Sequence, residues 1–139
     1  MKLEGTCHCG NIAIVLETEQ DPRDLPLRAC DCSFCRRHNA RTTADPKGRA
    51  RIGIQDRSLV SRYVFGLRTA QMVVCARCGV YCAAVMREAG EGWAVLNANL
   101  FLHPAFDRPA QSMSYEGEKP EERIARRKRL WSPLTLSET

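Results

Sequence analysis

Residues 75–79 read CARCG, a pair of cysteines with two residues between them and a glycine directly after. Residues 7–10 read CHCG, which has the same form with one residue between the cysteines. Such a turn can point backbone N–H groups at the sulfurs, and glycine tolerates the backbone angles that the turn needs. The two pairs together offer the four thiolates of a closed structural zinc site, which would join the start of the chain to residues 75–79. The predicted ligands are Cys7, Cys9, Cys75 and Cys78.

A third cysteine cluster lies between these pairs, in the stretch RACDCSFCRRHNA at residues 28–40. It holds Cys30, Cys32 and Cys35, and Arg36 and Arg37 follow it in place of a glycine. Three thiolates on Zn²⁺ leave a charge of −1, which guanidinium groups would offset, and the same groups can hold an anionic substrate. Three protein ligands with one exchangeable position are the usual arrangement of catalytic zinc. The cluster therefore predicts an open site.

The sequence also allows other roles for the cysteines. Cys82, or a histidine such as His8 or His38, can complete the middle cluster and make both sites structural. Cys82 lies in the apolar run VYCAAV, which favours a buried structural thiol. Lone histidines beside a metal loop more often orient a ligand or face solvent than bind metal. An iron–sulfur cluster is a further alternative, because thiolates also bind iron.

The overall composition indicates one globular domain. The chain has 139 residues, of which 44% are hydrophobic and 27% are charged. Its start has no apolar signal segment and no run is long enough to span a membrane, so we expect a cytoplasmic protein with no membrane partner. Eight cysteines then indicate metal rather than disulfides. Seven thiolates on two zinc ions would reduce the formal charge of +5 to about +2, which gives little support for nucleic-acid binding.

Most of the chain has the pattern of short strands separated by turns, which predicts a mainly β fold. Residues 89–92, AGEG, are a predicted hairpin turn, and residues 20–29 are a predicted loop. We expect residues 1–118 to form the zinc-binding domain, and residues 119–139 to be a basic tail packed on it or extending from it. The sequence of residues 119–131 predicts a solvated helix, with an arm that binds anions or nucleic acid as the alternative. The predicted strands lie within residues 11–19, 41–54, 59–66, 70–75, 79–88 and 92–100.

The order of the three cysteine clusters resembles the glutathione-dependent formaldehyde-activating enzyme (GFA) family, which also includes CENP-V-like proteins. The matching pieces are CHCG at residues 7–10, CDCSFCRR at residues 30–37 and CARCG at residues 75–79. NANL at residues 97–100 is similar to an asparagine-containing strand that follows in that family. The resemblance covers about residues 3–105 and implies a β-tent, in which short antiparallel sheets are pinned by zinc.

The resemblance also implies an activity and roles for the matching residues. The two outer cysteine pairs map onto the family's structural zinc, and Cys30, Cys32 and Cys35 map onto its catalytic zinc. The implied reaction is that of a carbon–sulfur lyase, S-(hydroxymethyl)glutathione synthase, which joins glutathione or another thiol to formaldehyde. Arg36 and Arg37 are candidates to hold a glutathione carboxylate, and His8 or His38 to relay a proton. CENP-V-like relatives imply the alternative of a non-catalytic, zinc-stabilised binding module.

Overall fold

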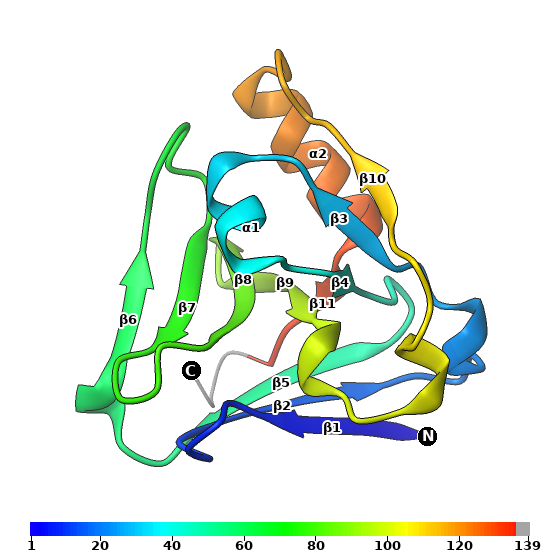
Figure 1. Cartoon of the computed structure of the whole chain (residues 1–139). Coiled ribbons are helices and arrows are strands. Elements are labelled where there is room, and N and C mark those ends of the chain that lie inside the picture. Colours follow the sequence, from blue (N-terminus) through cyan, green and yellow to red (C-terminus); the bar gives the residue numbers. More distant parts are fainter. Residues whose placement is uncertain (136–139) are drawn as a thin grey trace.

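A computed structural model describes residues 1–135 of the chain. In Figure 1 the strands outline a triangle, with a small sheet along its base and a larger sheet over its other two sides. The small sheet is antiparallel and consists of β1 (Lys2–Thr6), β2 (Ile12–Glu17) and β5 (Arg49–Ile54), with β2 in the centre. Ile12, Ile14 and Leu16 of β2 are fully buried, because alternate residues of a strand face the same side of its sheet.

The larger sheet carries the middle cysteine cluster and the turn with Cys75 and Cys78, whereas the turn with Cys7 and Cys9 belongs to the small sheet. The β8–β9 hairpin of the larger sheet turns at Ala89 and Gly90, which both have positive φ, 53° and 81°, as a tight two-residue hairpin turn requires. The hairpin predicted at residues 89–92 is therefore confirmed. The strand order is β10 (Gln111–Met113), β3 (Arg28–Cys30), β4 (Thr42–Thr43), β9 (Glu91–Asn97), β8 (Tyr81–Glu88), β7 (Gln71–Cys75) and β6 (Val60–Tyr63), with β11 (Ser132–Pro133) added beside β9.

Two α-helices lie against the larger sheet. The short α1 (Ser33–His38) follows β3, and Cys32 caps its start by accepting a hydrogen bond from the Cys35 N–H. The longer α2 (Pro120–Leu130) begins with proline and two glutamates, a favourable start for a helix. Short 3-10 turns, η1 (Pro22–Asp24), η2 (Arg57–Leu59), η3 (Ala98–Leu100) and η4 (Pro104–Phe106), connect the strands.

Apolar side chains form three separate clusters. The main core lies between the two sheets and includes Phe106, Leu96 and the cysteines Cys7 and Cys75. A second cluster joins α2 to the outer face of the hairpin, where Trp131 and Ile124 pack with Ala84, Met86 and Val95. A third, smaller cluster surrounds Cys35, Ala40 and Tyr81. Both outer cysteine pairs and the middle cysteine cluster thus adjoin packed apolar groups.

The predicted fold class is confirmed: the chain is mainly β, with small antiparallel sheets and a helix near its C-terminus. Residues 20–29 differ from the predicted loop, because they contain η1 and run into β3, whose partner β10 comes more than 80 residues later and runs parallel to it. Such a long-range pairing leaves no local pattern in the sequence. Within residues 1–135, every helix is too short or too polar to cross a membrane.

Candidate functional site: two cysteine centres

The two outer cysteine pairs come together as one group of four sulfurs. Cys7 and Cys9 lie in the turn between β1 and β2, and Cys75 and Cys78 lie at the end of β7 and in the turn after it. All four sulfurs lie within 4.8 Å of one another, with 3.8 Å from Cys7 to Cys9 and 3.6 Å from Cys9 to Cys75. Tetrahedral zinc with Zn–S bonds of about 2.3 Å places its sulfurs about 3.8 Å apart. The group fits a closed, four-coordinate metal site.

The turns that hold these cysteines have the predicted geometry. Gly10 and Gly79 have φ of 85° and 81°, which side chains rarely adopt. Backbone N–H groups donate to the sulfurs: Ile12 to Cys7 at 3.3 Å, and Cys78 to Cys75 at 3.5 Å. These donors favour thiolates, as metal ligation requires.

The pKa values of these thiols diverge. Burial raises the pKa of Cys7 to about 11. For Cys78, burial acts in the same direction, but hydrogen bonds from the backbone of Cys9 and Val80 outweigh it and bring its pKa to about 6. At neutral pH the group therefore already carries thiolate charge, and a cation would remove the remaining protons.

The middle cysteines form a separate group of three sulfurs. Cys30 ends β3, Cys32 caps α1 and Cys35 lies in the first turn of α1, and their sulfurs lie within 4.8 Å of one another. A hydrogen bond from the Cys35 thiol lowers the pKa of Cys30 to about 6. The same contact, with burial, raises the pKa of Cys35 far above its usual range. The donor set fits a soft metal ion with one position left for another ligand.

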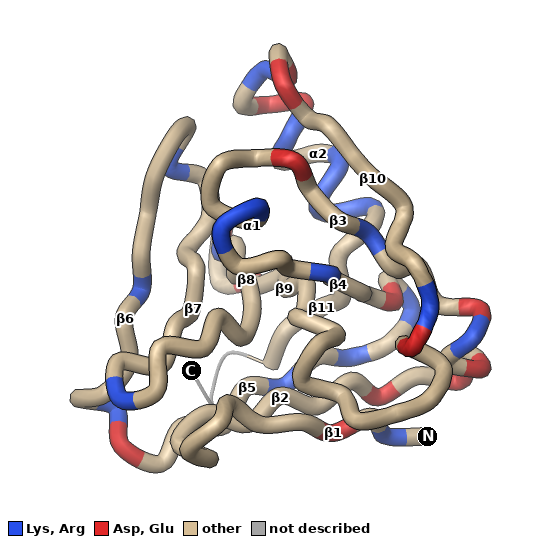
Figure 2. The backbone as a smooth tube through the Cα atoms, viewed as in Figure 1, with Lys and Arg blue, Asp and Glu red and all other residues tan. Residues whose placement is uncertain are grey.

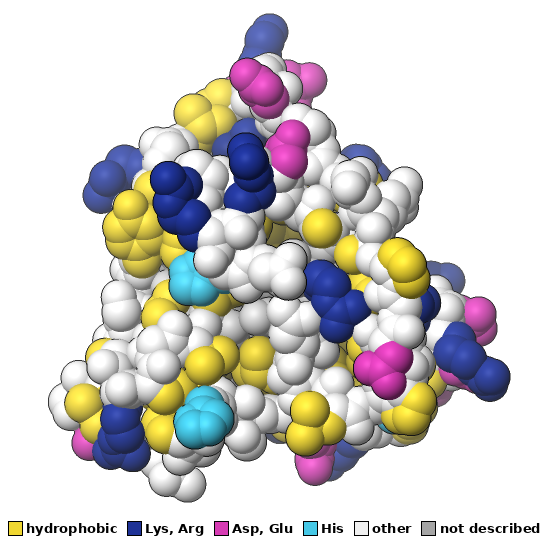
Figure 3. All heavy atoms as spheres, in the orientation of Figure 1, with side chains coloured by type: hydrophobic (Ala, Val, Ile, Leu, Met, Phe, Trp, Pro, Cys, Tyr) yellow, Lys and Arg dark blue, Asp and Glu magenta, His cyan; other side chains and the backbone are white. Residues whose placement is uncertain are grey.

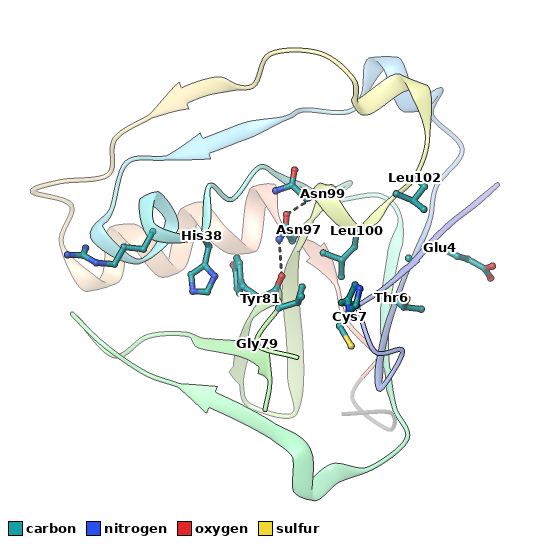
Figure 4. A pocket seen from close by; sticks show the side chains of 14 residues that line it. Glu4, Thr6, Cys7, His38, Gly79, Tyr81, Asn97, Asn99, Leu100 and Leu102 are labelled. Atoms are coloured by element: carbon teal, nitrogen blue, oxygen red, sulfur yellow. Dashed lines mark hydrogen bonds between the residues drawn. The ribbon is translucent and has the colours of Figure 1, made fainter. Parts of the chain in front are cut away.

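Within residues 1–135, the grouping of metal-ligand atoms around the middle cluster stops at these three sulfurs. Cys82 lies elsewhere: it is fully buried, its thiol donates to the Val80 carbonyl, and burial strongly raises its pKa. His8 and His38 line a groove of about 850 Å³ on the face shown in Figure 4. The His38 ring packs on Phe34 at 4.5 Å, and the middle cluster gains no fourth ligand from it.

The groove in Figure 4 is fixed by a buried asparagine. Asn97, at the end of β9, donates through Nδ2 to the Tyr81 carbonyl at 2.9 Å, and its Oδ1 accepts from the Asn99 N–H at 3.1 Å. These are the bonds drawn between β8, β9 and η3. Asn97 and Asn99 belong to the NANL stretch, so its asparagines support the chain around the groove.

The middle cluster opens instead on a cavity beneath α2. A space of about 430 Å³, here called the large chamber, is lined by Cys30, Cys32, Arg36 and Arg123 among others. A space of about 80 Å³, the small chamber, is lined by Arg28, Cys30, Cys35 and Trp131 among others. The two chambers adjoin, because they share four lining residues: Cys30, Tyr115, Arg126 and Arg127.

The structure separates the two arginines of α1. Arg36 lines the large chamber beside the cysteines. Arg37 lines the groove of Figure 4, and its Nη1 donates to the Ser33 carbonyl at 3.0 Å. Successive helix residues point about 100° apart, and here the two side chains leave α1 toward different cavities. Of the predicted pair, Arg36 alone lies beside the middle cluster.

The C-terminal helix supplies site residues that the sequence did not predict. We expected a solvated basic helix, and Lys128 and Arg129 are indeed exposed. Arg127 is the exception: it is 8% exposed and lines both chambers. In Figure 2 the cationic stretches of α1 and α2 lie in the same upper part of the molecule, although they are about 90 residues apart. The run of arginines in α2 is the feature of the sequence that could have indicated an anion-binding role, but it does not show which arginine is buried.

No family model matches the sequence. A crystal structure of a Rhodobacter sphaeroides protein from the Northeast Structural Genomics project has a similar fold, with a TM-score of 0.61. The two sequences are 30% identical, and the match covers 80% of this chain and 100% of that chain.

The chain belongs to the family of this Rhodobacter sphaeroides protein. The relationship rests on shared sequence as well as on a shared fold, and part of this chain has no counterpart in the Rhodobacter sphaeroides protein. What the cysteine centres do is therefore argued from the residues themselves.

Proposed function

We propose that the chain is a zinc-dependent enzyme of the carbon–sulfur lyase class, which joins a small thiol, glutathione in the first instance, to formaldehyde. The observation that carries this proposal is the cluster of Cys30, Cys32 and Cys35. Its three sulfurs lie together beside a cavity of about 430 Å³, and the grouping has no fourth ligand within residues 1–135. The resemblance of the cysteine motifs to the GFA family is our reason for proposing glutathione as the thiol and formaldehyde as the aldehyde.

Zinc is the metal that we assign to both centres, because tetrahedral thiolate sets of three or four are typical of it. Cys7, Cys9, Cys75 and Cys78 would hold a structural ion. Cys30, Cys32 and Cys35 would hold an ion that, when bound, activates a thiol or polarises a carbonyl oxygen.

The cavity residues provide binding and orientation. Arg36 and Arg127 present cations to the chambers beside the cysteines, and glutathione carries two carboxylates for which guanidinium groups are suited. The Arg126 guanidinium stacks on Tyr115, 3.6 Å from the ring centroid, and forms a rigid wall. α2 covers part of the chamber, and partial removal of water strengthens such charge interactions.

The reaction balances without a further reactant. The thiol sulfur forms a bond to the formaldehyde carbon, the carbon–oxygen π bond breaks, and the thiol proton passes to the aldehyde oxygen. Tyr115 and Glu116 line the large chamber and can exchange a proton there. They replace His8 and His38, which line the other groove, as our candidates for the proton relay.

NMR exchange spectroscopy of formaldehyde, glutathione and their adduct tests this proposal. We expect the zinc-loaded protein to accelerate the exchange, and Cys32→Ser to abolish the acceleration while the chain stays folded. Arg36→Gln should weaken it, whereas Arg37→Gln, the same charge change one residue later, should leave it within about twofold. If the exchange between formaldehyde, glutathione and their adduct is no faster than without the protein, the proposed activity is wrong.

A non-catalytic binding module is the second candidate, and one surface favours it. Phe34, Tyr63 and Phe65 stack on one another with ring centroids 5.5–5.9 Å apart, and Tyr63 is 51% exposed. Figure 3 shows hydrophobic side chains beside dark blue cations on this face. Aromatic rings next to cations suit stacked bases. Salt-sensitive, sub-micromolar binding of single-stranded nucleic acid, without thiol chemistry, would select this candidate.

A further inference from the structure

Arg127 is a buried cation with no salt bridge to an acidic residue within residues 1–135. It is 8% exposed, and its Nη1 donates to the Thr69 hydroxyl at 2.7 Å. Its Nε is buried and finds no hydrogen-bond partner in the described part of the chain. The nearby carboxylate of Glu118 is engaged by Arg123 at 3.0 Å and Arg126 at 2.8 Å. A buried guanidinium that is left incompletely bonded is destabilising, so an anion that bonded to it would stabilise this part of the molecule.

The small chamber is the place where such a ligand would lie. It is lined by Arg28, Arg126 and Arg127, and by buried apolar residues including Trp131, while none of its described lining residues is an aspartate or a glutamate. The large chamber is lined by four arginines, but Asp31 and Glu116 offset two of these charges, so its net positive charge is smaller. An anion is therefore favoured in the small chamber over the large one.

The dimensions of the small chamber and the hydrogen-bonding edge of Arg127 restrict the kind of anion. A volume of about 80 Å³ is several times the 10–15 Å³ that one water needs, which leaves room for a compact group. With Nη1 committed to Thr69, Nη2 and the buried Nε are left as donors, and side-by-side N–H donors match the two oxygens of a carboxylate. The same chamber reaches Cys30 and Cys35, so a ligand anchored there extends toward the sulfurs.

We propose that Arg127 anchors a carboxylate subsite in the small chamber, so that the middle cysteine centre takes a small thiol bearing a carboxylate and holds its sulfur at the cysteines. The assignment of the ligand's other end to a thiol rests on the proposed function. The carboxylate subsite itself does not, because it follows from the unpaired cation and the chamber. Arg126, fixed by Glu118 and Tyr115, serves as a wall of the subsite.

Trp131 provides a direct readout of occupancy, because it lines the small chamber and the Arg127 guanidinium lies 4.8 Å from its ring centroid. The zinc-loaded chain of 139 residues with Trp93→Phe keeps Trp131 as its single tryptophan. Titration with propionate, which has a carboxylate and no thiol, should change Trp131 emission in a saturable way. Ethanol, which is uncharged and carries no thiol, should not produce this change. Inorganic phosphate should bind more weakly than propionate.

Propionate binding by matched arginine variants of α2 tests whether Arg127 is the residue that binds the carboxylate. Arg127→Met should weaken propionate binding at least tenfold, and Arg129→Met, the same change at an exposed position of α2, should leave it within twofold. Arg127→Lys keeps the buried charge and should also lose about tenfold, because an ammonium cannot present two side-by-side donors. This variant keeps the test valid if Arg127→Met does not fold.

Three results would overturn the subsite: absence of saturable propionate binding, equal loss in the Arg127 and Arg129 variants, or tighter binding of phosphate than of propionate. Its failure is distinguishable from that of the proposed reaction. Propionate binding that depends on Arg127, in a protein that does not accelerate adduct exchange, would keep the subsite and reject the enzyme. Accelerated exchange that favours 3-mercaptopropionate no more than 2-mercaptoethanol would keep the enzyme and reject the subsite.

Discussion

Replacing Arg127 with methionine should stabilise the protein, although the arginine is buried. Burial, and then repulsion from Arg126 and Arg123, lower the pKa of Arg127 from 12.5 to about 10. That shift corresponds to about 3 kcal/mol against the charged form in the folded state. Methionine fills a similar space with an apolar, flexible side chain and removes this penalty.

The replacement also removes favourable contacts, which limits the gain. The hydrogen bond to Thr69 contributes about 1 kcal/mol, and the contact with the Trp131 ring contributes about 1 kcal/mol. Thr69 is half-buried, so water can take up its freed hydroxyl. We expect Arg127→Met to raise the free energy of unfolding by about 1 kcal/mol, which is about 3 °C in Tm for a chain of this size.

Thermal and urea unfolding of the zinc-loaded protein measure this change, with Arg129→Met as the exposed control. The folded-state pKa of Arg127 lies below its unfolded value, so the penalty is complete below about pH 10 and fades as the pH rises toward 12.5. The gain should therefore be equal at pH 6, 7 and 8. Propionate should raise the Tm of the wild type and leave that of the variant unchanged. A loss of more than about 1 kcal/mol in Arg127→Met would refute the reasoning, since Arg127 would then be structural.

Three further predictions concern the remaining parts of the molecule. Cys78→Ser should unfold the chain in circular dichroism, whereas Cys32→Ser should keep the fold and lose one zinc by mass spectrometry; equal loss of structure would contradict the division into two centres. Gly5→Ala should lower the free energy of unfolding by about 1–3 kcal/mol, because its Cβ would lie 2.3 Å from a carbonyl oxygen of η3, while Gly53→Ala, with open space, should not. Hydrogen bonds from arginines of α2 lower the pKa of Glu118, so Glu118→Gln should destabilise the protein at pH 7 by about 1–2 kcal/mol, and this difference should close as the pH falls through the lowered pKa; a difference that does not change with pH would show that the pairing is not ionic.

The cysteine centres could be predicted from the sequence because their geometry is local. Each pair lies within four residues, each glycine sits at the positive φ of its turn, and the spacing of Cys30, Cys32 and Cys35 suits a loop that enters a helix. The strands within residues 11–19, 41–54, 59–66, 70–75, 79–88 and 92–100 could also be predicted from their β-branched and apolar runs, whereas β1, β3, β10 and β11 could not.

The cavity beside the middle cluster could not be predicted, because it depends on contacts between distant segments. The parallel pairing of β3 with β10, and the packing of Trp131 on the β8–β9 hairpin, carry α2 to residues 30–35. α2 contains several arginines, and its sequence does not show which of them is buried. The burial of Arg127 and the exposure of Arg129 could therefore not be predicted. For the same reason, the sequence did not show that Arg36 and Arg37 line different cavities.

X-ray absorption at the zinc edge tests the central claim, that one cysteine centre is closed and the other is open to a thiol. A protein with two zinc ions, one bound by four sulfurs and one by three sulfurs and a lighter atom, should show about 3.5 sulfurs per zinc on average. Addition of glutathione should raise this value to about 4. A value of about 4 before any thiol is added, or a single zinc per chain, would contradict the open centre at Cys30, Cys32 and Cys35.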